Sequence, residues 1–321
     1  MAGKNNRSDE NIAQIYDKIF KRILTLSNVA VINFINGIFN KTFPKDSKLT
    51  YNWTENIKNS LDKTIADTII TVNDTEKFHA EVQINNDSTI VLRVFDYGYQ
   101  DALKYRKTDS DRIILEFPQS KVIFLEHSSN TPDEVILELS FGKKGKFEYK
   151  ISAMKFLDYS IDELNKQNLV ILLPLYLLKL RREIEKEQST ENALKLKALI
   201  NDGIIKSIED NEAAENITHD DTIILIGLLE KLYTHLYGGI KKFKEEGVKD
   251  MIAEKLILET DKIIYDKDNK IRIAEKKAEK SEEKKALEIA RNLLTMGMTI
   301  EQIKNVTNLP LNKIKGLQKQ K

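Results

Sequence analysis

The segment Phe78-His79-Ala80-Glu81-Val82-Gln83-Ile84 alternates apolar and polar side chains from end to end. Successive side chains of a β-strand point to opposite faces, so this pattern predicts a strand with one apolar and one polar face. The apolar face would pack on a core, and the polar face would carry His79, Glu81 and Gln83. Residues from Ile65 to Val72 are also rich in β-branched side chains. Because Asn73-Asp74-Thr75-Glu76 separates the two segments, the sequence predicts a β-hairpin.

The length of the hairpin loop determines which residue faces Asp67. A loop of residues 73–75 would pair Val72 with Glu76 and would place Asp67 directly opposite Glu81. The Cβ atoms of such a pair lie about 4.5–5.5 Å apart, and two carboxylates at that distance repel each other unless a cation neutralises them. Mg²⁺ prefers oxygen ligands of this kind. A two-residue loop would place Asp67 opposite Val82 instead. The alternative interpretation is a half-exposed hairpin whose acidic residues are ordinary surface groups.

Apolar periodicity predicts helices on both sides of this hairpin and further strands beyond it. Residues Ile12 to Phe39 follow a helical stripe, and Thr89 to Arg106 form a second helical segment. Three strand candidates follow, and Gly142-Lys143-Lys144-Gly145 forms the turn between the last two. Nearly everything from Leu173 onward has a helical pattern. The strand candidates are Lys121 to Glu126, Glu134 to Phe141 and Phe147 to Lys150.

The C-terminal part of the chain is dominated by charged helical segments. Residues Val248 to Leu294 alternate Lys and Glu at spacings that favour an exposed helix, which could pair with a copy of itself in a homodimer. Thr299 and Gln302 have the spacing of a capping box at the start of a further helix. The short helices joined by Asn308-Leu309-Pro310 would form a helical hairpin that resembles a helix-turn-helix.

The basic tail has three possible roles. Its helix could enter the major groove of DNA and contact it through Lys313 and Lys315. The tail could equally be a solvated hairpin or an assembly element.

The composition is that of a globular protein with a polar exterior. The 321 residues are 41% apolar and 31% charged, and the net charge of +1 offers no general basic excess for nucleic acid. A local basic face would still suffice for an enzyme. The sequence has no Cys, no apolar run near the roughly 20 residues that span a bilayer, and no apolar leader at its start. We therefore expect a cytoplasmic protein without membrane partners.

Four segments together resemble one family of nucleases. The pattern Asp67-x13-Glu81-Val82-Gln83 resembles the PD-(D/E)XK nuclease core in the variant where Gln replaces Lys. Tyr16-Asp17-Lys18-Ile19-Phe20-Lys21 resembles the D-x-x-F-K start of the recombination-promoting nuclease family, also described as PD-(D/E)XK nuclease family transposases. Residues 172–181, LLPLYLLKLR, resemble its Leu-Pro-rich helix start, and residues 290–303, ARNLLTMGMTIEQI, resemble its tail.

The resemblance implies an α/β fold with a PD-(D/E)XK (restriction-endonuclease-like) core and a helical C-terminal extension. It implies that Asp67 and Glu81 bind the metal, helped by the backbone carbonyl of Val82. Gln83 would take the place of the family's Lys and orient the attacking water or contact the scissile phosphate. Asp17 is a candidate third acid, or else a helix-surface charge.

Other residues near the predicted strand have weaker claims to a role. His79 shares a face with Glu81 and could carry a proton or contact the phosphate, although a plain surface His has the same pattern. Arg93 and Lys104 are candidate DNA contacts on the following helix. Tyr97 and Tyr105 could join them, although Tyr97 has the pattern of a residue that packs the helix on the sheet. We expect the remaining histidines to be structural; these are His127, His219 and His235.

The chain is expected to have four parts. Residues 1–187 would form the nuclease-like core and residues 188–247 a helical region. Residues 248–290 would form the long charged helix, and residues 291–321 the small helical hairpin.

The leading functional expectation is a Mg²⁺-dependent DNA endonuclease, with Mn²⁺ as a possible substitute, associated with DNA recombination or mobile elements. The second is a nuclease fold with little or no catalysis that acts as a DNA-binding or regulatory protein, because Gln83 is neutral where the family has Lys. The third is a helical scaffold with no enzymatic role, which the long Lys/Glu segment motivates.

Overall fold

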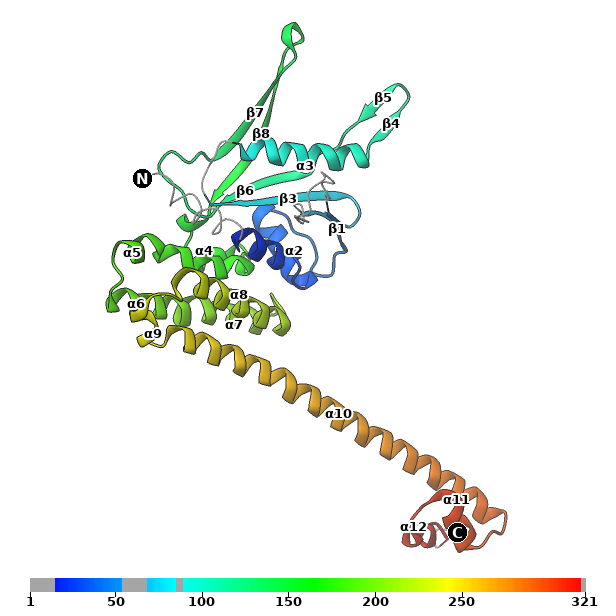
Figure 1. Ribbon diagram of the computed structural model, residues 1–321. Coiled ribbons are helices and arrows are strands. Elements are labelled where there is room, and N and C mark those ends of the chain that lie inside the picture. Colours follow the sequence, from blue (N-terminus) through cyan, green and yellow to red (C-terminus); the bar gives the residue numbers. More distant parts are fainter. Residues whose placement is uncertain (1–14, 54–67, 85–88, 319–321) are drawn as a thin grey trace, which may run out of the picture. The chain divides into compact units, whose positions relative to one another are not determined.

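In a computed structural model of the chain, the structure describes residues 15–53, 68–84 and 89–318. These residues form a mixed α/β structure built around a six-stranded sheet (Figure 1). The chain divides into two compact units, Met1–Leu256 and Ile257–Lys321, and the sheet belongs to the first unit. The α/β class predicted from the sequence is confirmed at this level.

The six-stranded sheet contains both antiparallel and parallel neighbours, in the order β1-β2-β3-β6-β8-β7. Strand β2 is antiparallel to both of its neighbours, β1 and β3, and β6 and β8 run parallel to β3. At the far edge β7 pairs with β8 in the antiparallel sense. The strands are β1 (Leu49–Trp53), β2 (Thr68–Val72), β3 (Glu76–Gln83), β6 (Gln119–Phe124), β7 (Glu134–Ser140) and β8 (Lys146–Lys155).

Helix α3 (Ile90–Lys104) lies in the connection between the parallel strands β3 and β6. The two strands and the helix therefore form a βαβ unit. A small hairpin of β4 (Lys107–Asp109) and β5 (Arg112–Ile114) follows the helix before β6 begins. The three-residue strands β4 and β5, like β1, were missed in the sequence analysis.

The register of the β2–β3 hairpin is the one predicted for a three-residue loop. Val72 pairs with Glu76, Ile70 pairs with Phe78 and Ile69 pairs with His79. Asn73 and Asp74 have positive φ angles of 50° and 57°, a conformation that Asn and Asp tolerate better than most residues. The loop chemistry therefore sets the register on which the predicted metal pair depends.

The predicted single helix from Ile12 to Phe39 is wrong, because the chain turns in the middle of that range. Residues Ile15–Ile23 and Asn28–Phe39 (α2) form two helices at an angle of 109°. Ser27 caps α2 by accepting a hydrogen bond from the Ala30 amide, and the Ser27 amide and hydroxyl both donate to the carboxylate of Asp221. The apolar stripe continues across the break, so periodicity alone did not reveal it.

Two apolar cores lie on opposite faces of the sheet, as the layers in Figure 1 show. The larger core packs the N-terminal helices and the later helices of the first unit against Ile70, Phe78 and Ile123. The smaller core packs α3 against Val122 and Phe124. The polar face of β3 is consequently the face that α3 covers.

The larger core is centred on an apolar 3₁₀ segment, η3 (Val170–Leu180), in which residues 170–178 are buried. The predicted helical character beyond Leu173 is confirmed for the described residues. The remaining elements of the first unit are η1 (Gly142–Lys144), η2 (Phe156–Asp158), α4 (Ile161–Lys166), α5 (Arg181–Lys186), α6 (Thr190–Ala198), η4 (Leu199–Ile205), α7 (Lys206–Ala213), α8 (His219–Tyr237) and α9 (Lys241–Glu245).

The long charged helix predicted for Val248 to Leu294 is confirmed as α10 (Val248–Thr295), which passes from the first unit into the second. The predicted helical hairpin is also present, as α11 (Ile300–Thr307) and α12 (Leu311–Gln318). Thr299 and Gln302 form the expected capping box. Ala290, Ile303, Leu309 and Ile314 form a small core that holds the hairpin together.

Gly37 and Gly227 provide a matched test of the packing in the first unit. A Cβ added to Gly37 would lie 1.7 Å from the backbone oxygen of Gln167, whereas a Cβ on Gly227 in α8 meets nothing within 4 Å. Gly37→Ala should therefore lower the free energy of unfolding by about 3 kcal/mol through overpacking. Gly227→Ala should raise it by about 1 kcal/mol, since Ala favours a helix interior over Gly. Urea denaturation of both variants checks this, and equal effects would contradict the packing.

Candidate functional site

Helix α3 lies over β3 with matched spacing of their facing side chains. On the helix, Arg93, Tyr97 and Asp101 recur every four residues, a rise of about 6 Å per step. On the strand, alternate residues from 77 to 83 recur every 6–7 Å or so. Side chains therefore meet in successive pairs along the two elements. At one end, Lys77 Nζ lies 2.6 Å from the buried Asp101 Oδ2.

At the other end of the strand, Arg93 contacts both Glu81 and Gln83. Arg93 Nη2 lies 3.3 Å from Glu81 Oε1 and donates a hydrogen bond of 2.6 Å to Gln83 Oε1. Glu81 is only 7% exposed, whereas 42% of the Arg93 side chain is exposed. The guanidinium thus neutralises a nearly buried carboxylate while part of it still faces solvent.

His79 is buried beneath α3 instead of lying on the surface, which corrects the surface interpretation of this residue. Its Nε2 atom lies 3.8 Å from Glu81 Oε2, and its ring meets the Tyr97 ring edge to face with 5.8 Å between centroids. Tyr97 therefore packs α3 on the sheet, as its pattern suggested. The half-exposed hairpin face considered above is wrong at these positions, because α3 covers it.

Asp67 lies outside the described residues, so the predicted Asp67–Glu81 pair is not described directly. The observed pairs Val72–Glu76 and Ile69–His79 follow the register that, continued by two residues, would place Asp67 opposite Glu81. Val82, the predicted carbonyl ligand, pairs with Ile123 of the parallel strand β6. The backbone oxygen of the next residue, Gln83, accepts a hydrogen bond from the Leu125 amide. The described part of the site thus lies at the carboxyl end of two parallel strands.

The other predicted site residues are distributed over three elements. Asp17 lies on the first helix and forms an ion pair of 2.9 Å with Lys21, consistent with a helix-surface charge. Lys104 lies at the end of α3, and its ammonium is 5.3 Å from the centre of the Tyr105 ring. Lys313 and Lys315 lie on α12 in the second unit and are exposed.

Near the carboxyl end of β6, a partly buried charge cluster forms around Arg181. Arg181 Nη1 lies 3.0 Å from Glu126 Oε1, and Arg181 Nε lies 2.7 Å from Glu185 Oε1. Burial raises the pKa of the Tyr16 hydroxyl, and the charge of Arg181 lowers it in part. The pKa of Arg181 is raised: burial opposes the charged form, but Glu126 and Glu185 outweigh it. The Arg181–Glu126 pair links the start of α5 to the segment that follows β6.

Removing the cation of this cluster should destabilise the first unit. Arg181→Met would leave Glu126, which is nearly buried, without its closest charge partner, and should lower the free energy of unfolding by about 3 kcal/mol. Arg182→Met is the matched control, because the Arg182 side chain is 62% exposed and lies 3.7 Å from Glu126. Glu126→Gln added to Arg181→Met should restore part of the loss. Equal stability of the two single variants in urea would contradict this role.

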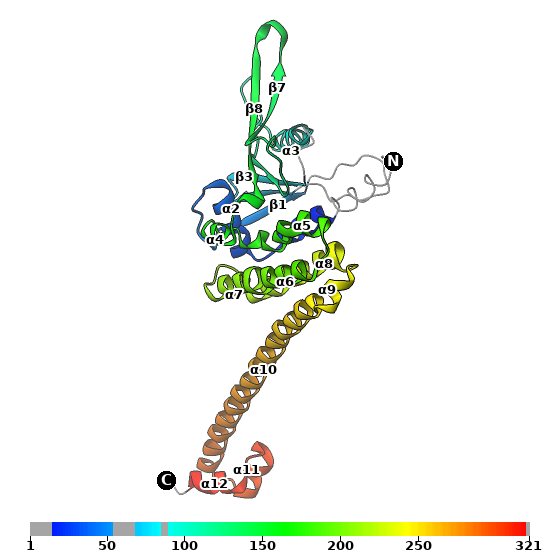
Figure 2. The same ribbon diagram turned by 90° about the vertical axis from the view of Figure 1, so that its left-hand side faces the viewer.

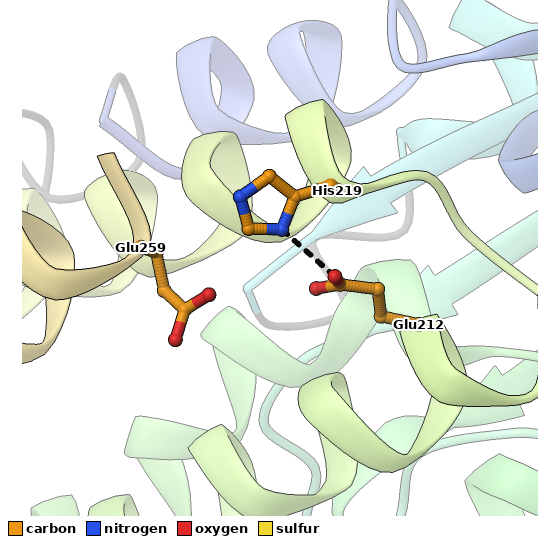
Figure 3. Close-up of side chains that lie close together, drawn as sticks. All are labelled: Glu212, His219 and Glu259. Atoms are coloured by element: carbon orange, nitrogen blue, oxygen red, sulfur yellow. Dashed lines mark hydrogen bonds and ion pairs between the residues drawn. The ribbon is translucent and has the colours of Figure 1, made fainter. Parts of the chain in front are cut away.

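Three side chains outside this site each carry an atom that could bind a metal ion: Glu212, His219 and Glu259 (Figure 3). His219 Nδ1 lies 2.7 Å from Glu212 Oε1, across the turn between α7 and α8. Glu259 belongs to the second unit, so only Glu212 and His219 lie together in the first unit. His219 was expected to be a purely structural residue, and its contact with Glu212 adds to that expectation. The signal for this pair was an acid at the end of one helix and a His at the start of the next.

No single helix within the described residues is long and apolar enough to cross a membrane. One bent pair of helices, Ile15–Ile23 and Asn28–Phe39, passes that test jointly, on length and composition alone.

Comparisons of the chain with protein-family models, with curated proteins and with solved structures gave no match.

Proposed function

We propose that this chain is a metal-dependent nuclease that hydrolyses DNA phosphodiester bonds. The observation that carries the proposal is the hairpin register, which is the one predicted for a three-residue loop, together with the nearly buried Glu81 carboxylate at the end of β3. The βαβ arrangement of β3, α3 and β6 also agrees with the core that the family resemblance implies. The finer assignment to the PD-(D/E)XK fold is part of this proposal.

The residues available suit a hard divalent cation such as Mg²⁺ or Mn²⁺. Glu81 supplies carboxylate oxygens, Asp67 would supply more, and the backbone carbonyl of Val82 is a further oxygen ligand. When bound, the metal would polarise the scissile phosphate and lower the pKa of a coordinated water. Two protein carboxylates leave coordination positions for water and a phosphate oxygen, as nuclease chemistry requires.

Arg93 is placed to supply the positive charge that Gln83 lacks. In the family pattern a Lys stands where this chain has Gln83, and an amide cannot neutralise the charge that develops on a phosphate. Arg93 hydrogen-bonds to Gln83 and remains partly exposed, so its guanidinium can contact a phosphate bidentately. A cation bound to Glu81 would weaken the attraction between Glu81 and Arg93. Arg93 could then leave Glu81 and contact the phosphate. Gln83 then orients the guanidinium or the attacking water.

The second candidate is DNA binding without cleavage, and the Arg93–Glu81 ion pair favours it. An arginine already neutralises Glu81, so this carboxylate does not need a metal for charge balance. In that case the exposed lysines of the tail, Lys313 and Lys315, would contribute to DNA binding.

We place either activity in the cytoplasm and associate it with DNA recombination or mobile elements. A homodimer through α10 stays a prediction.

Incubation of the wild-type chain with supercoiled plasmid tests the proposal. Nicking should occur with Mg²⁺ or Mn²⁺ and should be absent with Ca²⁺ or EDTA. Retention of the plasmid in a gel without nicking under any of these conditions would favour the binding protein. If neither binding nor cleavage occurred, and Mg²⁺ did not raise the melting temperature, the helical scaffold would remain.

A further inference from the structure

The β7–β8 hairpin extends beyond the layer formed by α3, as Figures 1 and 2 show. At its base, Val135 and Ile151 are buried in the smaller core against α3. Further along, Tyr149 contacts the rings of Phe95 and Phe117 at centroid distances of 5.5 and 5.7 Å. The hairpin is therefore anchored on the same helix that carries Arg93. We call residues 139–147 the arm tip.

One face of the hairpin stays apolar as it leaves this core. Leu137 and Leu139 alternate along β7, share a face, and pair with Tyr149 and Phe147, and Phe141 follows the end of the strand. The inner residues are partly buried, but Phe141 is 61% exposed and Phe147 is 60% exposed. Two large aromatic side chains are thus held in solvent at the tip.

Lysines also gather in the tip, with Glu138 and Glu148 flanking it on the two strands. It contains Lys143, Lys144 and Lys146 and no acidic residue, so three positive charges lie within it. Lys146 pairs with Glu138 at 2.7 Å, while Lys143 and Lys144 are exposed in the turn. Gly142 and Gly145 have φ angles of 61° and 114°, which side chains with a Cβ rarely adopt. The turn therefore presents the lysines in a defined conformation.

We propose that the arm tip binds duplex DNA beside the nuclease site, an inference that rests on the proposed function. The lysines would contact backbone phosphates, and the two phenylalanines would lie against sugars and bases in a groove. The arm is a two-stranded ribbon, and the roughly 12 Å wide major groove of a DNA duplex admits such a ribbon. A second copy of the arm is a poor partner, because two such tips would repel each other.

The closing experiment measures binding of the full chain to a fluorescent duplex in EDTA, where metal-dependent cleavage cannot occur. Lys143→Gln/Lys144→Gln should weaken binding about tenfold and reduce the slope of log K against log salt by about 2. The matched control, Lys241→Gln/Lys242→Gln on α9, removes the same charge from exposed positions and should leave both values unchanged. Equal behaviour of the two variants would overturn the proposal.

A tryptophan at the tip tests which partner the aromatic residues contact. In Trp53→Phe/Phe147→Trp, which carries a single tryptophan, the duplex should quench the emission, and vesicles of phosphatidylserine and phosphatidylcholine should leave it unchanged. A response to vesicles alone would overturn the proposal.

Plasmid cleavage by the lysine variants separates the two proposals. DNA binding that depends on the tip, in a chain that never cleaves, would support the arm and contradict the nuclease. Cleavage by the chain, with unaltered DNA binding in the tip variant, would support the nuclease and contradict the arm.

Discussion

Glu81→Gln should reduce the rate of Mg²⁺-dependent DNA cleavage by about 10³-fold, because it removes a charged ligand from the metal while keeping the shape of the side chain. The amide would also lose the ion pair with Arg93. Single-turnover cleavage of a labelled duplex measures the effect. Mg²⁺ should raise the melting temperature of the wild type and not that of the variant, since only the wild type would bind the ion.

The loss of activity in Glu81→Gln must be separated from a loss of folding. Arg93 is too exposed for its ion pair with Glu81 to contribute much stability, so the metal-free variant should unfold within about 1 kcal/mol of the wild type. Glu76→Gln is the control, because Glu76 lies on the same strand and pairs with Lys41 at 2.7 Å. Unchanged cleavage by Glu81→Gln, or an equal loss in Glu76→Gln, would contradict the role of Glu81.

Arg93→Met should lower cleavage by about 10²-fold, because it removes the partly exposed guanidinium that hydrogen-bonds to Gln83 and pairs with Glu81. Arg93→Lys should retain an intermediate rate, because Lys supplies the charge without the planar, bidentate fork. Single-turnover rates at saturating enzyme separate this effect from weaker binding.

A second substitution tests whether Arg93 replaces the missing Lys. If Arg93 supplies the charge, the double variant Arg93→Met/Gln83→Lys should cleave DNA at least tenfold faster than Arg93→Met. Rescue would not occur if Arg93 only packs α3 on the sheet. Full activity of Arg93→Met alone would contradict any role for this arginine in the chemistry.

The local pattern around β3 was sufficient to predict the hairpin, because alternation over residues 78–84 defined the faces of the strand. It left two registers open, and the structure shows the one with a three-residue loop, in which Asn73 and Asp74 adopt positive φ angles. The break at Ser27 could not be predicted in the same way, because it depends on a contact with Asp221, far away in the chain. The short strand β1 was missed because its residues, Leu-Thr-Tyr-Asn-Trp, become a strand by pairing with β2.

The burial of the site is a tertiary property that single-strand patterns do not contain. His79 and Glu81 alternate like surface residues, and they are buried because α3 folds back over β3. The signal available in the sequence was the four-residue repeat of Arg93, Tyr97 and Asp101, which matches the two-residue repeat of the strand. Together, the two repeats predict that Arg93 contacts Glu81 and Gln83. Glu212 and His219 likewise come together through a turn between helices.

The central claim is that Asp67 and Glu81 together hold the metal that cleaves DNA. Its most direct test is nicking of supercoiled plasmid in Mg²⁺ by the wild type and by Asp67→Asn/Glu81→Gln, in preparations matched for their melting temperature in EDTA. The wild type should convert the plasmid to the nicked form, and the double variant should leave it supercoiled. Nicking at equal rates by both proteins would contradict the assignment.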